Sequence, residues 1–112
     1  MSIMKKQKYH HKDLRSDVLT IATKNIDQLG SASISLRKIS AAIGVSPMAV
    51  YHHFPSKKDL LMVLAEQYRR ELDAKMHIDT DQYTTPKDKL VAMGTLYISY
   101  ATLFPERFQL MF

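Results

Sequence analysis

The sequence predicts an all-α fold, in which a three-helix helix-turn-helix domain is followed by a long connecting helix and the beginning of a helical bundle. Three observations support this. Apolar residues recur three and four positions apart through most of the chain, glycines and prolines stand where helices should end or begin, and no segment alternates like a strand. The 112 residues suit one ordinary domain, and the 46% hydrophobic and 24% charged residues suit a globular chain.

The first predicted helix covers residues 12–29. Gly30 follows it at the position of a C-terminal cap, and the polar run from Ser31 to Ser35 is short enough for a turn. The apolar positions with helical spacing are Leu14, Val18, Ile21, Ala22, Ile26 and Leu29.

Two short helices come next. Ser35 is a suitable N-cap for a helix that continues to about Ile43 and ends at Gly44. Ser46 and Pro47 then supply an N-cap and a first-turn proline for a helix that stops near His53, because Pro55 cannot continue it. The predicted buried face of the earlier helix consists of Leu36, Ile39, Ala42 and Ile43.

Three further helices are predicted. Ser56 and Asp59 resemble a capping box and open a long amphipathic helix. The helical spacing of apolar residues ends after Asp73, and a polar linker is predicted over residues 75–83. Thr85 and Pro86 start a fifth helix that ends near Phe104, and Pro105 starts a sixth. The apolar face of the long helix is Leu60, Leu61, Val63, Leu64, Tyr68 and Leu72.

The fifth helix is apolar on nearly every side, which is typical of a helix buried among several others. Only residues 105–112 follow it, too few to cover it. Either a partner chain supplies the cover or the protein is a shortened version of a longer one, and we expect the second.

The net charge of +5 is unevenly distributed. Residues 1–58 contain ten Lys/Arg and three Asp/Glu (+7), whereas residues 59–112 contain six and eight (−2). A basic first half favours a polyanionic partner. The chain has no cysteine, which excludes disulfides and thiol catalysis and suits the reducing cytoplasm, where we expect the protein. We expect no signal peptide, because no apolar run follows the N-terminal lysines, and no membrane span.

An enzyme is not expected, because the sequence contains no glycine-rich phosphate loop, no carboxylate pair at useful spacing and no HExxH motif. No cofactor is expected either. The adjacent His52 and His53 do not form a metal site, because neighbouring side chains on a helix point about 100° apart. The pair at His10 and His11 is better explained by a loose basic tail.

The segment Gly44-Val45-Ser46 joins the two short helices in a way that fits a helix-turn-helix. Glycine permits the tight reversal, Val45 can pack between the helices, and the capped second helix exposes backbone N–H groups that suit a phosphate. In this motif the second helix enters the DNA major groove.

The segment LRKISAAIGVSPMAVYHHFPSKKDLL, from Leu36 to Leu61, resembles the DNA-binding signature of the TetR family of bacterial transcriptional regulators. The matching parts are the Leu-Arg-x-Ile opening, Gly-Val-Ser at the turn, Val-Tyr-x-His-Phe at the end of the recognition helix and Ser-Lys-x-x-Leu-Leu after it. The resemblance implies a DNA-binding domain at residues 12–72 and a partial ligand-binding and dimerisation domain at residues 73–112.

The resemblance also implies roles for individual residues. Arg37 matches a position that can reach a guanine edge, although a solvent-exposed arginine is the alternative. Met48 and Ala49 could touch thymine methyl groups or pack inward. Tyr51 and Lys57 match phosphate contacts. The complete predicted DNA-binding set is Ser35, Arg37, Ser46, Pro47, Met48, Ala49, Tyr51, His52, His53 and Lys57, with His53 favoured over His52 as the matched histidine.

The resulting hypothesis is a sequence-specific transcriptional regulator, a repressor of the TetR type that binds a palindromic double-stranded operator as a homodimer and responds to a small-molecule effector. Two alternatives stay open. One is a helical protein-interaction module that seats a partner on the apolar fifth helix, and the other is a shortened regulator without an effector response.

Overall fold

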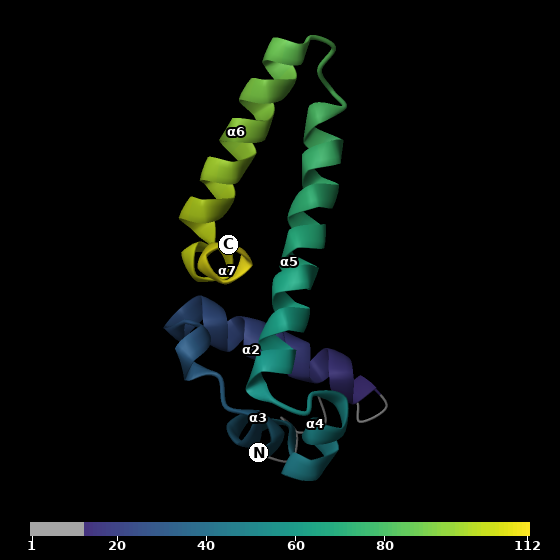
Figure 1. Cartoon of the computed structure of the whole chain (residues 1–112), viewed down its shortest axis with the longest axis vertical. Helices are drawn as coiled ribbons and strands as arrows, with labels where there is room; N and C mark the ends of the chain where they lie inside the picture. The colour runs from purple at the N-terminus through teal and green to yellow at the C-terminus, as the bar shows by residue number, and fades with distance from the viewer. Residues whose placement is uncertain (1–12) are drawn as a thin grey trace, which may run out of the picture. The chain divides into compact units, whose positions relative to one another are not determined.

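The computed structural model describes residues 13–112, which contain six α-helices, one short 3-10 helix and no strand (Figure 1). The predicted all-α fold is therefore confirmed. The predicted helix start at Lys12 and most of the N-terminal segment, including His10 and His11, lie outside the described residues. The elements are α2 (Leu14–Leu29), η2 (Ser31–Ser33), α3 (Leu36–Ile43), α4 (Pro47–His53), α5 (Lys57–Thr80), α6 (Pro86–Leu103) and α7 (Pro105–Met111).

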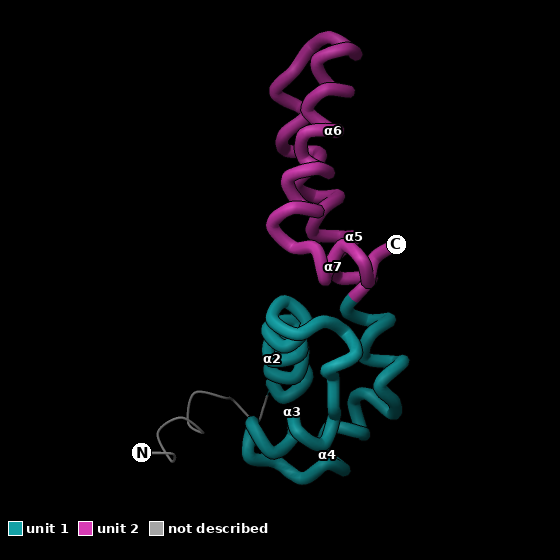
Figure 2. The backbone as a smooth tube through the Cα atoms, turned by 90° about the vertical axis from the view of Figure 1, so that its left-hand side faces the viewer, with its two compact units in different colours: residues 1–64 teal, residues 65–112 magenta. Residues whose placement is uncertain are grey.

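The chain forms two compact units that divide within α5 (Figure 2). The first unit ends at Leu64, and the second runs from Ala65 to Phe112. The first contains α2, α3, α4 and the start of α5, and the second contains the rest of α5 with α6 and α7. These compact units divide earlier in α5 than the predicted domain boundary after residue 72, which stays a prediction.

The core of the first unit forms where α2 packs against both α3 and α4. The apolar side chains that point inward from these helices recur at helical spacing, as expected for amphipathic helices. Those with no exposed surface are Val18, Ala22, Ile26, Ile39, Ile43 and Val50. Phe54, directly after α4, and Leu60, on α5, are buried with them. This core fixes the orientation of the two short helices.

The predicted helix caps are confirmed. The Ser35 hydroxyl accepts a hydrogen bond from the Lys38 N–H at 3.2 Å, and the Thr85 hydroxyl accepts one from the Asp88 N–H at 3.2 Å. Ser56 accepts from the Asp59 N–H, and its own hydroxyl donates to the Asp59 carboxylate at 2.7 Å. This second bond replaces the usual return bond of a capping box, in which the acidic side chain reaches the backbone N–H of the cap.

One buried position was predicted wrongly. Ala42 on α3 is exposed. Leu29, the last apolar position of the α2 pattern, also retains 74% of its surface. In place of Ala42, Ser40 completes the inward face of α3 beside Ile39 and Ile43. A buried serine is acceptable there because its hydroxyl donates to the Arg37 carbonyl at 2.7 Å.

The predicted polar linker over residues 75–83 is also wrong, because α5 continues to Thr80. Met76 lies one turn after Leu72, which itself follows Tyr68, and all three are buried. The Thr80 hydroxyl donates to the Met76 carbonyl at 2.8 Å in the last turn. The inward face therefore extends beyond the point where the sequence pattern weakens, and the polar residues of this segment occupy the solvent side.

The expectation that the fifth helix is buried on most sides does not hold for α6 in this chain. Leu96 and Tyr100 are its buried residues, whereas Leu90, Val91, Ile98 and Leu103 are each at least 60% exposed. The residues that follow, in α7, cover the end of α6 but not its length (Figure 1). Within residues 13–112, no helix combines the length and hydropathy of a membrane span.

Candidate nucleic-acid interface

The candidate interface consists of α3, α4 and the three residues that join them. Gly44 has φ 92° and ψ 30°, the left-handed conformation, which side chains with a Cβ disfavour. Its N–H and that of Val45 both donate to the Ser40 carbonyl, at 2.9 and 3.0 Å. The turn thus satisfies backbone groups at the end of α3 and redirects the chain into α4.

Helix α4 has two distinct sides. Val50 and Phe54, four residues apart, are buried against the core, and this leaves Met48, His52 and His53 exposed on the other side. Met48 retains 75% of its surface, so inward packing of this residue is wrong. Ala49 and Tyr51 are half-buried. A helix anchored on one side with its other side exposed has the arrangement that groove entry requires.

The start of α4 is formed by Ser46 and Pro47, as predicted. The Ser46 hydroxyl accepts from the Ala49 N–H at 3.3 Å, and proline in the first turn needs no acceptor. His52 and His53, in the last turn, place their rings edge to face with centroids 5.6 Å apart. Among the described residues, no group of three or more potential metal ligands comes together.

Arg37 lies in the first turn of α3, directly after the capping Ser35, and its side chain is exposed. Its backbone carbonyl accepts a hydrogen bond from the Ser40 hydroxyl, and its exposed side chain carries the guanidinium. The arginine therefore lies at the start of α3, at the opposite end of this helix from the turn that leads to α4.

Lys57 begins α5, and its ammonium group donates to the Ala32 carbonyl at 3.1 Å. This bond links residues 25 positions apart and ties the start of α5 to the segment that precedes α3. The lysine is exposed, so its charge stays accessible.

The sequence interpretation did not include Arg15 among the residues of the interface. Its guanidinium carbon lies 5.4 Å from the centroid of the Phe54 ring, which connects α2 with the residue that ends α4. This is a cation–π contact that helps to hold α4 in place. Nothing local in the sequence signals it, because the two residues are 39 positions apart (54 minus 15).

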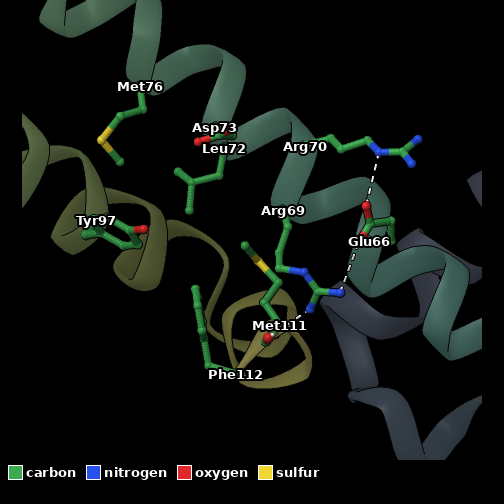
Figure 3. A pocket seen from close by; sticks show the side chains of 9 residues that line it. All are labelled: Glu66, Arg69, Arg70, Leu72, Asp73, Met76, Tyr97, Met111 and Phe112. Atoms are coloured by element: carbon green, nitrogen blue, oxygen red, sulfur yellow. Dashed lines mark hydrogen bonds and ion pairs between the residues drawn. The ribbon is translucent and has the colours of Figure 1, made fainter.

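The second unit contains a cavity of about 320 Å³ (Figure 3). Arg69 lines it and donates to the Met111 carbonyl and to the Glu66 carboxylate, both at 3.1 Å. Arg70 pairs with the same carboxylate at 3.2 Å. The hydrogen bond from Arg69, together with the charge of Arg70, holds the pKa of Glu66 below its ordinary value. The lining residues are Glu66, Arg69, Arg70, Leu72, Asp73, Met76, Tyr97, Met111 and Phe112.

Comparison with known proteins gives one family-model match that includes the candidate interface and several similar regulators. Residues 19–64 match the model of the family described as bacterial regulatory proteins, tetR family. The chain is 28% identical over 92 residues to the HTH-type transcriptional regulator BetI of Brucella abortus, an alignment that covers 82% of this chain and 46% of that protein. It is 36% identical over 62 residues to the HTH-type transcriptional regulator AcrR of Shigella flexneri, which covers 55% of this chain and 29% of AcrR.

The chain spans about half the length of the BetI proteins it matches. No solved structure matches it significantly.

Proposed function

Because the chain belongs to the TetR family of bacterial regulatory proteins, we propose that it binds double-stranded DNA sequence-specifically and regulates transcription, as a repressor that occludes a promoter. The observation that carries this proposal is α4, which is anchored by Val50 and Phe54 and exposes Met48, His52 and His53. Its short length and its capped start suit insertion into the major groove.

The contacts fall into two groups. Tyr51 and Lys57 bind phosphates and set the register of the protein on the duplex, together with the helix starts capped by Ser35 and Ser46. Arg37, Met48 and Ala49 contact base edges, the arginine at guanine and the other two at thymine methyl groups. Pro47, His52 and His53 complete the DNA-facing surface, and the operator is palindromic if the protein binds it as a homodimer.

The binding experiment measures the affinity for the DNA upstream of the gene, by fluorescence anisotropy across a series of salt concentrations. Each phosphate neutralised contributes about 0.9 to the slope of log K against log salt. We expect a steep slope for the wild type and uniformly weaker binding for Tyr51→Ala. A flat salt dependence contradicts the proposal.

Base contact is tested with Arg37→Ala against a set of operators that differ at single positions. Loss of a bidentate arginine should remove about 1–3 kcal/mol of discrimination at one base pair. Lys38→Ala is the matched control, because this exposed cation is the next residue of α3. The control should discriminate among the operators as the wild type does. An equal loss of discrimination in the two variants contradicts the role of Arg37.

Control by a small molecule is the second part of the proposal. The cavity of about 320 Å³ in the second unit is at the lower end of ligand pockets, which measure roughly 300–1,000 Å³. Apolar surface from Met76 and Tyr97 accompanies the charged groups of Arg69 and Asp73 there.

The test screens small organic molecules for compounds that raise the Tm of the wild type and weaken its binding to the operator. Met76→Trp fills the cavity and should abolish both effects of such a compound. A compound that acts equally on this variant does not use the cavity.

A further inference from the structure

The described methionines differ widely in exposure. Met48 on α4 retains 75% of its surface and Met62 on α5 retains 61%, whereas Met76 and Met111 are buried. Met93 on α6 lies between these extremes, at 38%. Met48 is therefore the most exposed methionine in the part of the chain that the structure describes.

The methionine sulfurs are the groups of this chain that hydrogen peroxide attacks first, because the sequence has no cysteine. The sulfur lone pair attacks one oxygen of the peroxide, the O–O bond breaks and an S–O bond forms. The proton on the transferred oxygen passes to the departing hydroxide, which leaves as water. Sulfur is oxidised, peroxide is reduced, and methionine becomes methionine sulfoxide. Exposed methionines react before buried ones, so Met48 and Met62 should react before Met76 and Met111.

Met48 lies on the side of α4 that is proposed to meet DNA. It is the second residue of this helix, and Val50 and Phe54 anchor the opposite side in the core. Residues near the start of a recognition helix are the ones that contact base edges. A thioether suits an apolar contact with a thymine methyl group. A sulfoxide adds a polar oxygen without a hydrogen to donate, and this oxygen finds no partner at a methyl group or at a phosphate oxygen.

From this combination of exposure and position we propose that Met48 is a reversible oxidation site, at which peroxide converts the thioether to a sulfoxide and weakens DNA binding. The inference rests on the proposed DNA-binding function. Met48 lies outside the core, so its oxidation leaves the fold intact, unlike oxidation of the buried Met76. Methionine sulfoxide reductases reverse the step: two thiols become a disulfide, the sulfoxide oxygen leaves as water, and the thioether is restored.

Graded treatment of the 112-residue chain with hydrogen peroxide tests the proposal. At each dose, peptide mass spectrometry measures the sulfoxide fraction at every methionine, and fluorescence anisotropy measures the affinity for the DNA upstream of the gene. We expect the affinity to fall in step with oxidation of Met48, by at least roughly fivefold at full conversion, and to recover after treatment with the reductases. An affinity that does not fall when Met48 is oxidised overturns the proposal. Resistance of Met48 to doses that oxidise Met62 also overturns it.

Met48→Leu and Met62→Leu separate the two most exposed sulfurs. Leucine is close to methionine in volume and cannot form a sulfoxide. After peroxide, Met62→Leu should lose affinity as the wild type does, whereas Met48→Leu should keep the affinity that it has before treatment. An equal loss in the two variants overturns the assignment to Met48.

Two further measurements separate this inference from other effects of peroxide and from the proposed function itself. Circular dichroism follows the helices during the treatment, and a loss of helical signal in step with the Met48 sulfoxide would assign the effect to the fold and overturn the proposal. An untreated wild type that does not bind the DNA contradicts the proposed function, and the inference with it. Normal binding that oxidation leaves unchanged overturns the inference alone.

Discussion

The ammonium group of Lys57 donates a 3.1 Å hydrogen bond to the backbone carbonyl of Ala32, and this bond joins the start of α5 to the segment before α3. The same lysine is a proposed phosphate contact. One side chain is thus expected to serve both the fold and the DNA interface, and the two contributions can be measured separately.

Lys57→Ala should lower the affinity for operator DNA and reduce the salt slope by about 1, because one phosphate contact is lost. Its free energy of unfolding should change by less than about 1 kcal/mol, because the hydrogen bond is exposed to solvent. Fluorescence anisotropy and urea denaturation measure the two quantities. Lys58→Ala is the charge-matched control, and an equal loss of affinity in both variants would assign the effect to net charge alone.

Ser46→Ala should destabilise the protein by about 1 kcal/mol, because α4 loses the hydroxyl that accepts from the Ala49 N–H. Ser46→Asp keeps an acceptor at the cap, so its Tm should stay near that of the wild type. The added negative charge should nevertheless weaken DNA binding if the start of α4 faces a phosphate. Undiminished operator affinity in Ser46→Asp would restrict Ser46 to the capping role.

Gly44→Ala should cost about 1–2 kcal/mol in urea denaturation, because the backbone at this residue is left-handed. Gly44→Asn should lose less, since asparagine tolerates this conformation better than alanine. If the two variants are equally unstable, the residue type at position 44 is restricted by the space around the turn and not by the backbone conformation.

Glu66→Gln should destabilise the second unit slightly at neutral pH, by removing the carboxylate that pairs with Arg69 and Arg70. The pKa of Glu66 is lower in the folded chain than its ordinary value. The ionised carboxylate therefore contributes fully to the stability of the fold at a pH above the ordinary pKa, and this contribution is lost as the pH falls through the lowered pKa of the folded chain. Thermal melts of both proteins should therefore converge in acid. The pair is exposed, so raised salt should also reduce the difference.

The helix starts and the turn of the interface followed from the sequence because they depend on local chemistry. Ser35, Ser46 and Thr85 cap helices through hydrogen bonds to residues only three positions later. Gly44 marks the turn because its own backbone conformation favours glycine. The candidate DNA-binding residues were proposed from a short motif, so their identities also came from local sequence.

Other features were decided by contacts between distant residues. The last turns of α5 form although the sequence there is polar, because Met76 extends the buried face begun by Tyr68 and Leu72. Ser40 rather than Ala42 lies on the inward side of α3, which packs against α2, and its hydroxyl is satisfied locally by the Arg37 carbonyl. The apolar composition of α6 predicts a buried helix. Which of its sides are buried depends on the helices that pack against it.

The sequence by itself determined the helical class, the boundaries of the short helices and the residues proposed to meet DNA, since each depends on periodicity, capping or a contiguous motif. Only the tertiary structure placed Lys57 against Ala32 and Arg15 over Phe54, and only it showed Val91 and Ile98 of α6 open to solvent. Such relationships depend on two segments that are far apart in the sequence but close in space. Whether they come together is decided by the free energy of packing of the whole unit, which neither segment determines alone.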